Sequence, residues 1–87
     1  MQAISRKVDE LGRIVIPIEI REQLGIKEND SLTMYIDTKR IILENGKTVD
    51  ALGRIVIPKE TRKVLGIEER EELEIEVIDN KIILNKK

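Results

Sequence analysis

The sequence predicts a mainly β fold with two short helices, in which two similar halves of one chain close a single small barrel. The first observation is a repeat: sliding the 87-residue chain by 41 positions compares Val8–Leu43 with Val49–Leu84, and 19 of those 36 pairs are identical. The second is the composition, because the apolar residues are almost all Ile, Val and Leu, which favour strands. The third is that no flexible linker separates the copies and one copy alone is too small for a good core.

Each copy is predicted to form strand, strand, helix, strand, strand. Gly12 allows a tight connection between the first two strands, because glycine adopts positive φ at low cost. Pro17 is typical of a helix start and Gly25 of the position after a helix end. The expected elements are Ile4–Val8, Arg13–Ile16, the helix Ile18–Leu24, Ser31–Ile36 and Arg40–Leu43, then Lys47–Asp50, Arg54–Ile57, the helix Lys59–Leu65, Glu72–Ile78 and Lys81–Leu84. We expect one barrel domain over residues 1–87, with repeat 1 at 1–46 and repeat 2 at 47–87, because interleaved halves remove exposed strand edges.

The composition excludes several classes of function. The chain has no His and no Cys, which rules out the usual zinc sites and the Ser–His and Cys–His nucleophile pairs. We expect no enzymatic activity, no cofactor, no metal site and no small-molecule substrate. The acidic segment 68–76 is better explained as a half-buried strand, because its Glu residues alternate with apolar ones, and Tyr35 aligns with Glu76 on the same outer face. The lack of Cys fits a reducing cytoplasm, and no apolar run is long enough to span a membrane.

The charges are unevenly distributed, although the 16 basic and 17 acidic residues nearly cancel. Residues 47–66 carry a net charge of +3, and residues 67–79 a net charge of −6. A face that gathers the recurring arginines of both copies can neutralise the phosphates of a duplex. The residues alone leave open the alternative of solvated surface charges, such as a structural salt bridge between Arg13 and Asp9. Two arginines recur in the second copy: Arg13 as Arg54, and Arg21 as Arg62.

A family resemblance rests on the string from Arg6 to Arg21, which includes Asp9-Glu10-Leu11-Gly12-Arg13-Ile14-Val15-Ile16-Pro17, and on Leu24-Gly25-Ile26 and Ile41-Ile42-Leu43. On these residues the chain resembles the DNA-binding domain of the AbrB/SpoVT transition-state regulators, present in two copies. The resemblance implies a swapped-hairpin β-barrel, in which two ββαββ units interleave their hairpins. Here both units are fused in one chain, so we expect a monomeric pseudo-dimer, with higher assembly as the alternative if hairpins swap between chains.

The resemblance also implies a transcriptional regulator that binds double-stranded DNA, more by its shape than by a fixed base code. One departure from the family is Glu22, where a second arginine is frequent. Another is the turn after each helix, where the family's Gly-Asp pair reads Asn29-Asp30 and Arg70-Glu71. An arginine at positive φ costs about 1 kcal/mol, so either the turn differs in the second copy or that copy is strained. Carried over by position, the expected DNA-binding residues are Arg6, Arg13, Arg21, Lys47, Arg54, Arg62 and Lys63.

Two alternative functions stay open on the sequence. One is an AbrB-fold antitoxin, whose barrel binds operator DNA while a tail neutralises a toxin; the given sequence stops at Lys87 without an extended tail. The other is a compact fused or engineered barrel whose DNA binding is weak or absent.

Overall fold

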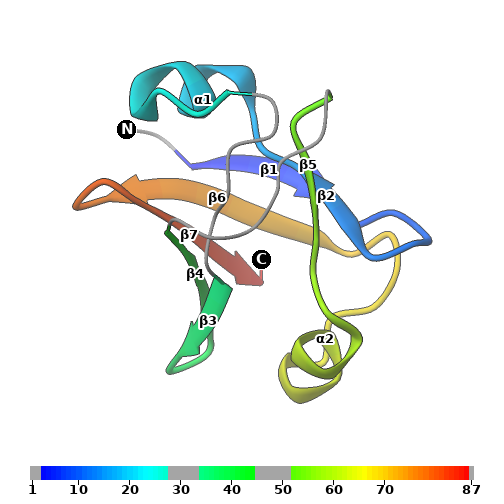
Figure 1. The fold of residues 1–87 in the computed structure, drawn as a ribbon. Coiled ribbons are helices and arrows are strands. Elements are labelled where there is room, and N and C mark those ends of the chain that lie inside the picture. Colours follow the sequence, from blue (N-terminus) through cyan, green and yellow to red (C-terminus); the bar gives the residue numbers. More distant parts are fainter. Residues whose placement is uncertain (1–2, 28–33, 45–51, 87) are drawn as a thin grey trace.

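The computed structural model describes residues 3–27, 34–44 and 52–86, which form a mainly β structure with two short helices, as predicted (Figure 1). All strand pairs are antiparallel. The elements in chain order are β1 (Ile4–Lys7), β2 (Arg13–Val15), α1 (Ile18–Leu24), β3 (Met34–Asp37), β4 (Arg40–Leu43), β5 (Arg54–Val56), α2 (Lys59–Leu65), β6 (Glu72–Ile78) and β7 (Lys81–Lys86).

Most element bounds agree with the sequence prediction. The helices α1 and α2 and the strands β4 and β6 have the predicted bounds, whereas β1, β2 and β5 each end one residue earlier. β7 continues two residues further, to Lys86, because β6 offers pairing partners as far as Leu73. β3 ends one residue later than expected, at Asp37. The predicted strand Lys47–Asp50 and residues 31–33 lie outside the described residues.

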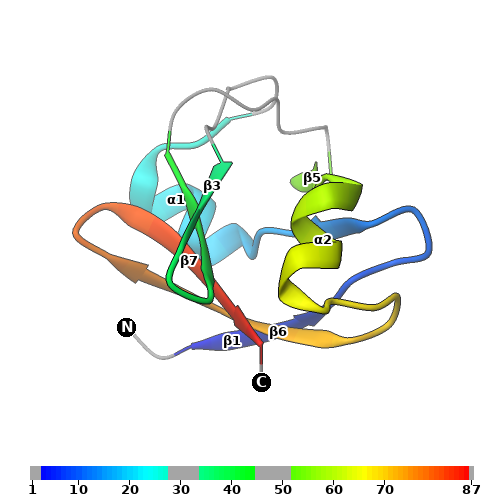
Figure 2. The ribbon, with the colours of Figure 1, turned by 90° about the horizontal axis from the view of Figure 1, so that it is seen from below.

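The strands form two sheets, and each sheet contains strands of both copies. β2 pairs with β5, while the five-stranded sheet has the order β1-β6-β7-β4-β3. Ile14 lies opposite Ile55 in the small sheet, and Ile42 lies opposite Ile83 in the large one. Both pairs join residues 41 positions apart, so the sequence repeat becomes a pseudo-two-fold axis. The two helices lie on opposite sides of the molecule (Figure 2).

Both copies contribute to one buried cluster of Ile, Leu and Val. Along β6, Leu73 and Ile75 are buried while Glu72, Glu74 and Glu76 are half-buried, which confirms the predicted alternation. Among the described residues, no polar or charged residue is buried. Packing across the copies therefore provides the apolar stabilisation. The cluster consists of Val8, Ile14, Ile16, Ile20, Ile41, Leu43, Ile55, Ile57, Ile67, Leu73, Ile75, Ile82 and Leu84.

Residues with positive φ end both helices and shape the turn that follows α2. Gly25 and Gly66 each have a φ of 68° directly after α1 and α2, as predicted. Pro17 lies just before the helix with an extended ψ of 143°, so the helix begins at the next residue. Arg70 also has a φ of 68°, and its N–H donates to the carbonyl oxygen of Val8 at 2.6 Å. Of the two outcomes that the sequence left open, the strained turn in the second copy is the one observed.

Candidate nucleic-acid interface

The turn between β1 and β2 orients Arg13 through the carboxylate of Asp9. Asp9 Oδ1 accepts hydrogen bonds from the backbone N–H groups of Leu11 and Arg13, at 2.9 and 2.8 Å. Asp9 Oδ2 accepts from Arg13 Nε at 2.7 Å. The salt bridge considered from the sequence is therefore present. A guanidinium has five N–H donors, so this contact leaves the terminal nitrogens of Arg13 to serve a further acceptor.

These contacts favour the ionised form of Asp9 over its neutral form. Partial burial favours its neutral form, but the hydrogen bonds from Arg13 and Leu11 and the charge of the guanidinium lower the pKa of Asp9 below its ordinary value of 3.8. Both side chains of the pair keep 29% of their surface exposed, so solvent screens the attraction. The pair is chiefly an orienting contact for Arg13.

Arg21 and Arg62 contact the turns of the opposite copy. Arg62 Nε donates to the carbonyl oxygen of Ile57 at 3.0 Å. The Arg62 guanidinium lies so close to Gly12 that a Cβ at Gly12 would be 2.6 Å from Arg62 Cζ. The N–H of Ile57 in turn donates to the carbonyl oxygen of Gly12 at 2.8 Å. The other half repeats these contacts with Arg21, Ile16 and Gly53. We call the arrangement the arginine–glycine clamp: Arg62 on Gly12, and Arg21 on Gly53.

The clamp places a second requirement on Gly12 and Gly53. Each has a φ of 77°, as the tight turn demands. Each also leaves room for a guanidinium that any side chain would displace. Sequence reasoning found the first requirement and missed the second. A signal for it was present, because an arginine follows each of these glycines after nine positions in both copies.

The clamps bring predicted site residues of different copies together. Arg62 lies against the residue that precedes Arg13, and Arg21 lies against the residue that precedes Arg54. Each turn is therefore flanked by one arginine of its own copy and one of the other copy. The register of β2 and β5 also places Arg13 and Arg54 symmetrically about the pseudo-two-fold axis.

The remaining predicted DNA-binding residues do not take part in the clamps. Arg6 is exposed on β1, and its guanidinium donates to the carbonyl oxygen of Ser5 at 2.9 Å. Lys63 is exposed on α2, directly after Arg62. Lys47 lies outside the described residues. The structure thus brings the four recurring arginines to the two turns and leaves Arg6 and Lys63 at exposed positions.

Leu11 and Leu52 are exposed apolar residues in these turns. Each keeps 63% of its surface exposed, although both belong to a small protein with a well-buried apolar cluster. Sequence reasoning gave them no role. Their recurrence directly before Gly12 and Gly53 was the available signal. They add an apolar surface beside the arginine that follows each glycine.

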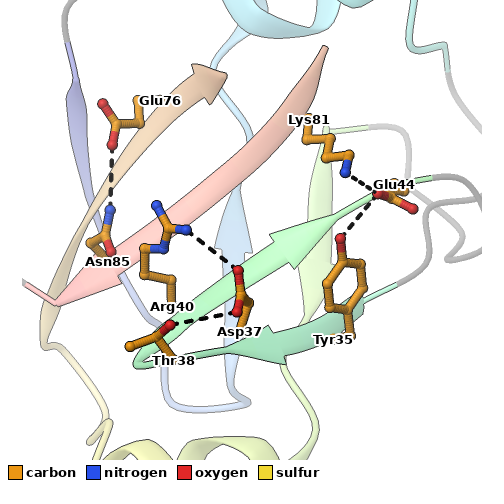
Figure 3. Close-up of polar contacts among 8 residues, drawn as sticks. All are labelled: Tyr35, Asp37, Thr38, Arg40, Glu44, Glu76, Lys81 and Asn85. Atoms are coloured by element: carbon orange, nitrogen blue, oxygen red, sulfur yellow. Dashed lines mark hydrogen bonds and ion pairs between the residues drawn. The ribbon is translucent and has the colours of Figure 1, made fainter. Parts of the chain in front are cut away.

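A second group of polar contacts joins the copies on the outer face of the large sheet (Figure 3). Glu44 Oε1 accepts a hydrogen bond from the Tyr35 hydroxyl at 3.0 Å. The same oxygen lies 3.0 Å from Lys81 Nζ, in an ion pair that joins the two copies. Lys81 and Tyr35 hold the pKa of Glu44 below its ordinary value, and Glu44 raises the pKa of Lys81. At the related positions of the second copy, the Asn85 amide donates to Glu76 Oε1 at 3.4 Å. Tyr35 therefore lies on the outer face, as predicted.

The described residues contain neither a cluster of metal-binding side chains nor a helix that could span a membrane. Within residues 3–27, 34–44 and 52–86, no three carboxylates come together in a way that could hold a metal ion. Over the same ranges, neither helix has the length and apolar character needed to cross a bilayer.

Fold and site together define a small antiparallel β protein in which two arginine-bearing turns are related by a pseudo-two-fold axis within one chain. The chain belongs to the family described as "Antidote-toxin recognition MazE, bacterial antitoxin", whose model matches residues 5–48 and again residues 46–87. The two matches correspond to the two copies and confirm the tandem assignment made from the sequence.

Three relatives of the chain are proteins of Bacillus subtilis (strain 168). The chain is 61% identical over 44 residues to the transition state regulatory protein AbrB, covering 51% of this chain and 46% of that protein. It is 52% identical over 44 residues to the putative transition state regulator Abh, covering 51% and 48%. It is 53% identical over 34 residues to stage V sporulation protein T, covering 39% and 19%. The chain spans about half the length of the first two relatives, and the predicted AbrB/SpoVT resemblance is confirmed.

Among solved structures, the chain is similar to the solution structure of PHS018 from Pyrococcus horikoshii. The TM-score is 0.62 at 24% sequence identity, and the match covers 97% of this chain and 88% of that one. At this identity the likeness supports the fold alone.

Proposed function

We propose that this chain is a duplex-DNA-binding transcriptional regulator of AbrB type, which grips DNA through the paired arginines of a pseudo-two-fold face. The regulators among its relatives support this role, and neither their names nor the family description is that of an enzyme. The observation that carries the proposal is the symmetric placement of Arg13 and Arg54, each beside a clamp arginine of the other copy. Two clusters related by such an axis suit a roughly palindromic site.

In this proposal the two pairs of arginines have different roles. The terminal nitrogens of Arg13 and Arg54 bind phosphates, and Arg21 and Arg62 hold the turns and share the contact. Because Asp9 already orients Arg13 at 2.7 Å, less side-chain freedom is lost when DNA binds. The complete set of proposed DNA-binding residues is Arg6, Arg13, Arg21, Lys47, Arg54, Arg62 and Lys63.

We also propose that the two sheets close one swapped-hairpin barrel over residues 1–87, built from repeat 1 (1–46) and repeat 2 (47–87). The support is that β1–β6, β2–β5 and β4–β7 each join different copies, and that one buried cluster draws on both. A single chain then suffices, and light scattering should give the chain mass of 10.0 kDa. Twice that mass would refute the one-chain barrel.

Fluorescence anisotropy of a labelled AT-rich duplex tests the DNA proposal. With about six phosphate contacts, raising the salt from about 50 to 200 mM should weaken binding about 10³-fold. The variant Arg13→Ala/Arg54→Ala should weaken binding and lower the slope of log K against log salt by about 2. The matched control Lys27→Ala/Lys81→Ala removes the same charge elsewhere and should keep most of the affinity. Equal losses in the two double variants, or no binding at low salt, would refute the arginine face.

The family description supports a second candidate function, that of an antitoxin. In that role the chain would bind a protein toxin. The test compares the growth of cells that express a toxin paired with an antitoxin of this family, with and without co-expression of the chain. Rescue of growth that persists in Arg13→Ala/Arg54→Ala would assign the toxin contact to a different surface from the DNA face.

A further inference from the structure

A groove of about 650 Å³ lies between the turn joining β3 to β4, the helix α2 and the end of β7. Figure 2 shows the β3–β4 hairpin beside α2. This volume is typical of small-molecule sites, which range over about 300–1,000 Å³. We propose that the groove binds a small amphipathic anion, namely a carboxylate or phosphate head joined to an apolar tail. The residues that line it are Thr38, Lys39, Arg40, Val64, Leu65, Asn85 and Lys86.

The charge of the groove suits an anionic head group. Its lining contains Lys39, Arg40 and Lys86, and no carboxylate is found among the described residues that line it. Arg40 lies 3.4 Å from Asp37, and Lys86 lies 3.2 Å from Glu71, but neither acid belongs to the lining (Figure 3 shows the first pair). Arg40 and Lys86 keep 39% and 42% of their side-chain surface exposed, respectively. Exposed pairs of this kind contribute little, so a bound anion can compete with the two carboxylates. Lys86 Nζ also donates to the carbonyl oxygen of Gly66 at 3.0 Å, a contact that keeps the ammonium beside the groove.

The groove also offers an apolar surface for a tail. Val64 keeps 73% of its surface exposed, although it belongs to a helix whose neighbouring Leu65 packs against the core. An apolar tail that covers Val64 removes this surface from water, which is favourable. The cations and the valine therefore favour one ligand chemistry together, and neither feature alone would specify it.

The positions related to this groove by the pseudo-two-fold axis show that the fold itself does not require this chemistry. The positions related to the lining by 41 residues hold Gln23 in place of Val64 and Asn80 in place of Lys39. Two carboxylates, Glu44 and Asp79, occupy positions related to Asn85 and Thr38. The backbone repeats while the charge does not, so the cationic and apolar character belongs to one end of the molecule.

Chemical-shift perturbation in ¹⁵N-labelled full-length chain tests the proposal. Octanoate and octyl phosphate should shift the amides of Lys39, Val64 and Lys86 in a saturable way. Inorganic phosphate, which lacks the tail, and octyltrimethylammonium, which carries the opposite charge, should bind much more weakly. A preference for one of the two octyl anions identifies the head group. Equal shifts by octyltrimethylammonium, or equally tight binding of inorganic phosphate, would overturn the proposal.

Variants that borrow residues from the other copy provide the control for specificity. Lys39→Asn/Val64→Gln should weaken octyl phosphate binding about tenfold, because a cation and the apolar surface are lost together. Lys7→Asn removes the same charge outside the groove and should leave the affinity unchanged, and urea unfolding checks that each variant folds. Wild-type affinity in Lys39→Asn/Val64→Gln, or the absence of saturable shifts at the groove, would refute the site. The readout does not involve DNA, so this proposal and the proposed regulator function fail or succeed separately.

Discussion

Replacing Gly12 with alanine should destabilise the protein more than the same replacement at Gly25. Both glycines have positive φ, of 77° and 68°. Left-handed strain therefore costs about 1–2 kcal/mol at either position. A Cβ at Gly25 meets nothing within 4 Å, whereas one at Gly12 lies 2.6 Å from Arg62 Cζ. The difference between the two variants therefore isolates the clamp.

The size of that difference follows from what Arg62 must give up. To avoid the new Cβ, the guanidinium has to leave Gly12 and its 3.0 Å hydrogen bond to the carbonyl oxygen of Ile57. A hydrogen bond from a charged donor contributes about 1.5–3 kcal/mol, and the lower end applies because Arg62 is only partly buried. We expect a loss of about 2.5–4 kcal/mol for Gly12→Ala and about 1–2 kcal/mol for Gly25→Ala.

Urea unfolding followed by circular dichroism measures both losses by linear extrapolation. A double-mutant cycle with Arg62→Ala sharpens the test, because contacting residues couple whereas independent ones add. Without the guanidinium, Gly12→Ala should cost only the backbone strain of about 1–2 kcal/mol. Equal losses at Gly12 and Gly25, or the same loss for Gly12→Ala with and without Arg62, would refute the clamp.

The other expectations concern titration and strain. The pKa of Asp9 is lowered in the folded chain, so its stabilising contribution is complete above the ordinary value of 3.8 and is lost as the pH falls through the lower folded value. The difference between the urea midpoints of wild type and Asp9→Asn should therefore be largest at pH 7 and shrink as the pH falls below 3.8, and a difference that stays constant into acid would contradict this. Arg70→Gly should stabilise the chain by about 1 kcal/mol, because it relieves a φ of 68° while keeping the N–H bond to Val8. Arg70→Ala keeps the Cβ and should give no gain, so equal stability of these two variants would count against strain. In Glu44→Gln, the raised pKa of Lys81 should fall back towards 10.5 in an NMR titration, and an unchanged value would mean that another group raises it.

Local signals were enough to predict most of the secondary structure. Pro17, Gly25 and their counterparts in the second copy delimit two helices whose bounds agree with the prediction. The repeat further indicated that the halves interleave. It did not predict that Ile14 meets Ile55 and Ile42 meets Ile83, because register depends on contacts between segments far apart in the chain.

The candidate site was predictable in its membership but not in its geometry. Arg13 and Arg21 stood out because both recur, and a salt bridge between Arg13 and Asp9 was one alternative that the residues left open. The contact of each helix arginine with a glycine of the opposite copy was not foreseen. It joins positions about fifty residues apart in one case and about thirty in the other, and no local pattern encodes such a distance. Only the assembled fold reveals that Arg21 and Arg62 are tied to the backbone through Nε.

The axis through Ile14 and Ile55 relates two halves of one polypeptide, and this changes how the protein can evolve. In a dimer of identical chains, every mutation is inherited at both ends, and a change that helps one end must be tolerated by the other. In the proposed one-chain barrel each codon is expressed once per particle, and 17 of the 36 compared positions already differ between the copies. Selection can therefore act on Glu22 without altering Lys63. If the chain is the regulator proposed above, an operator with two unequal arms lies within its reach by single mutations, whereas a homodimer first needs a gene duplication.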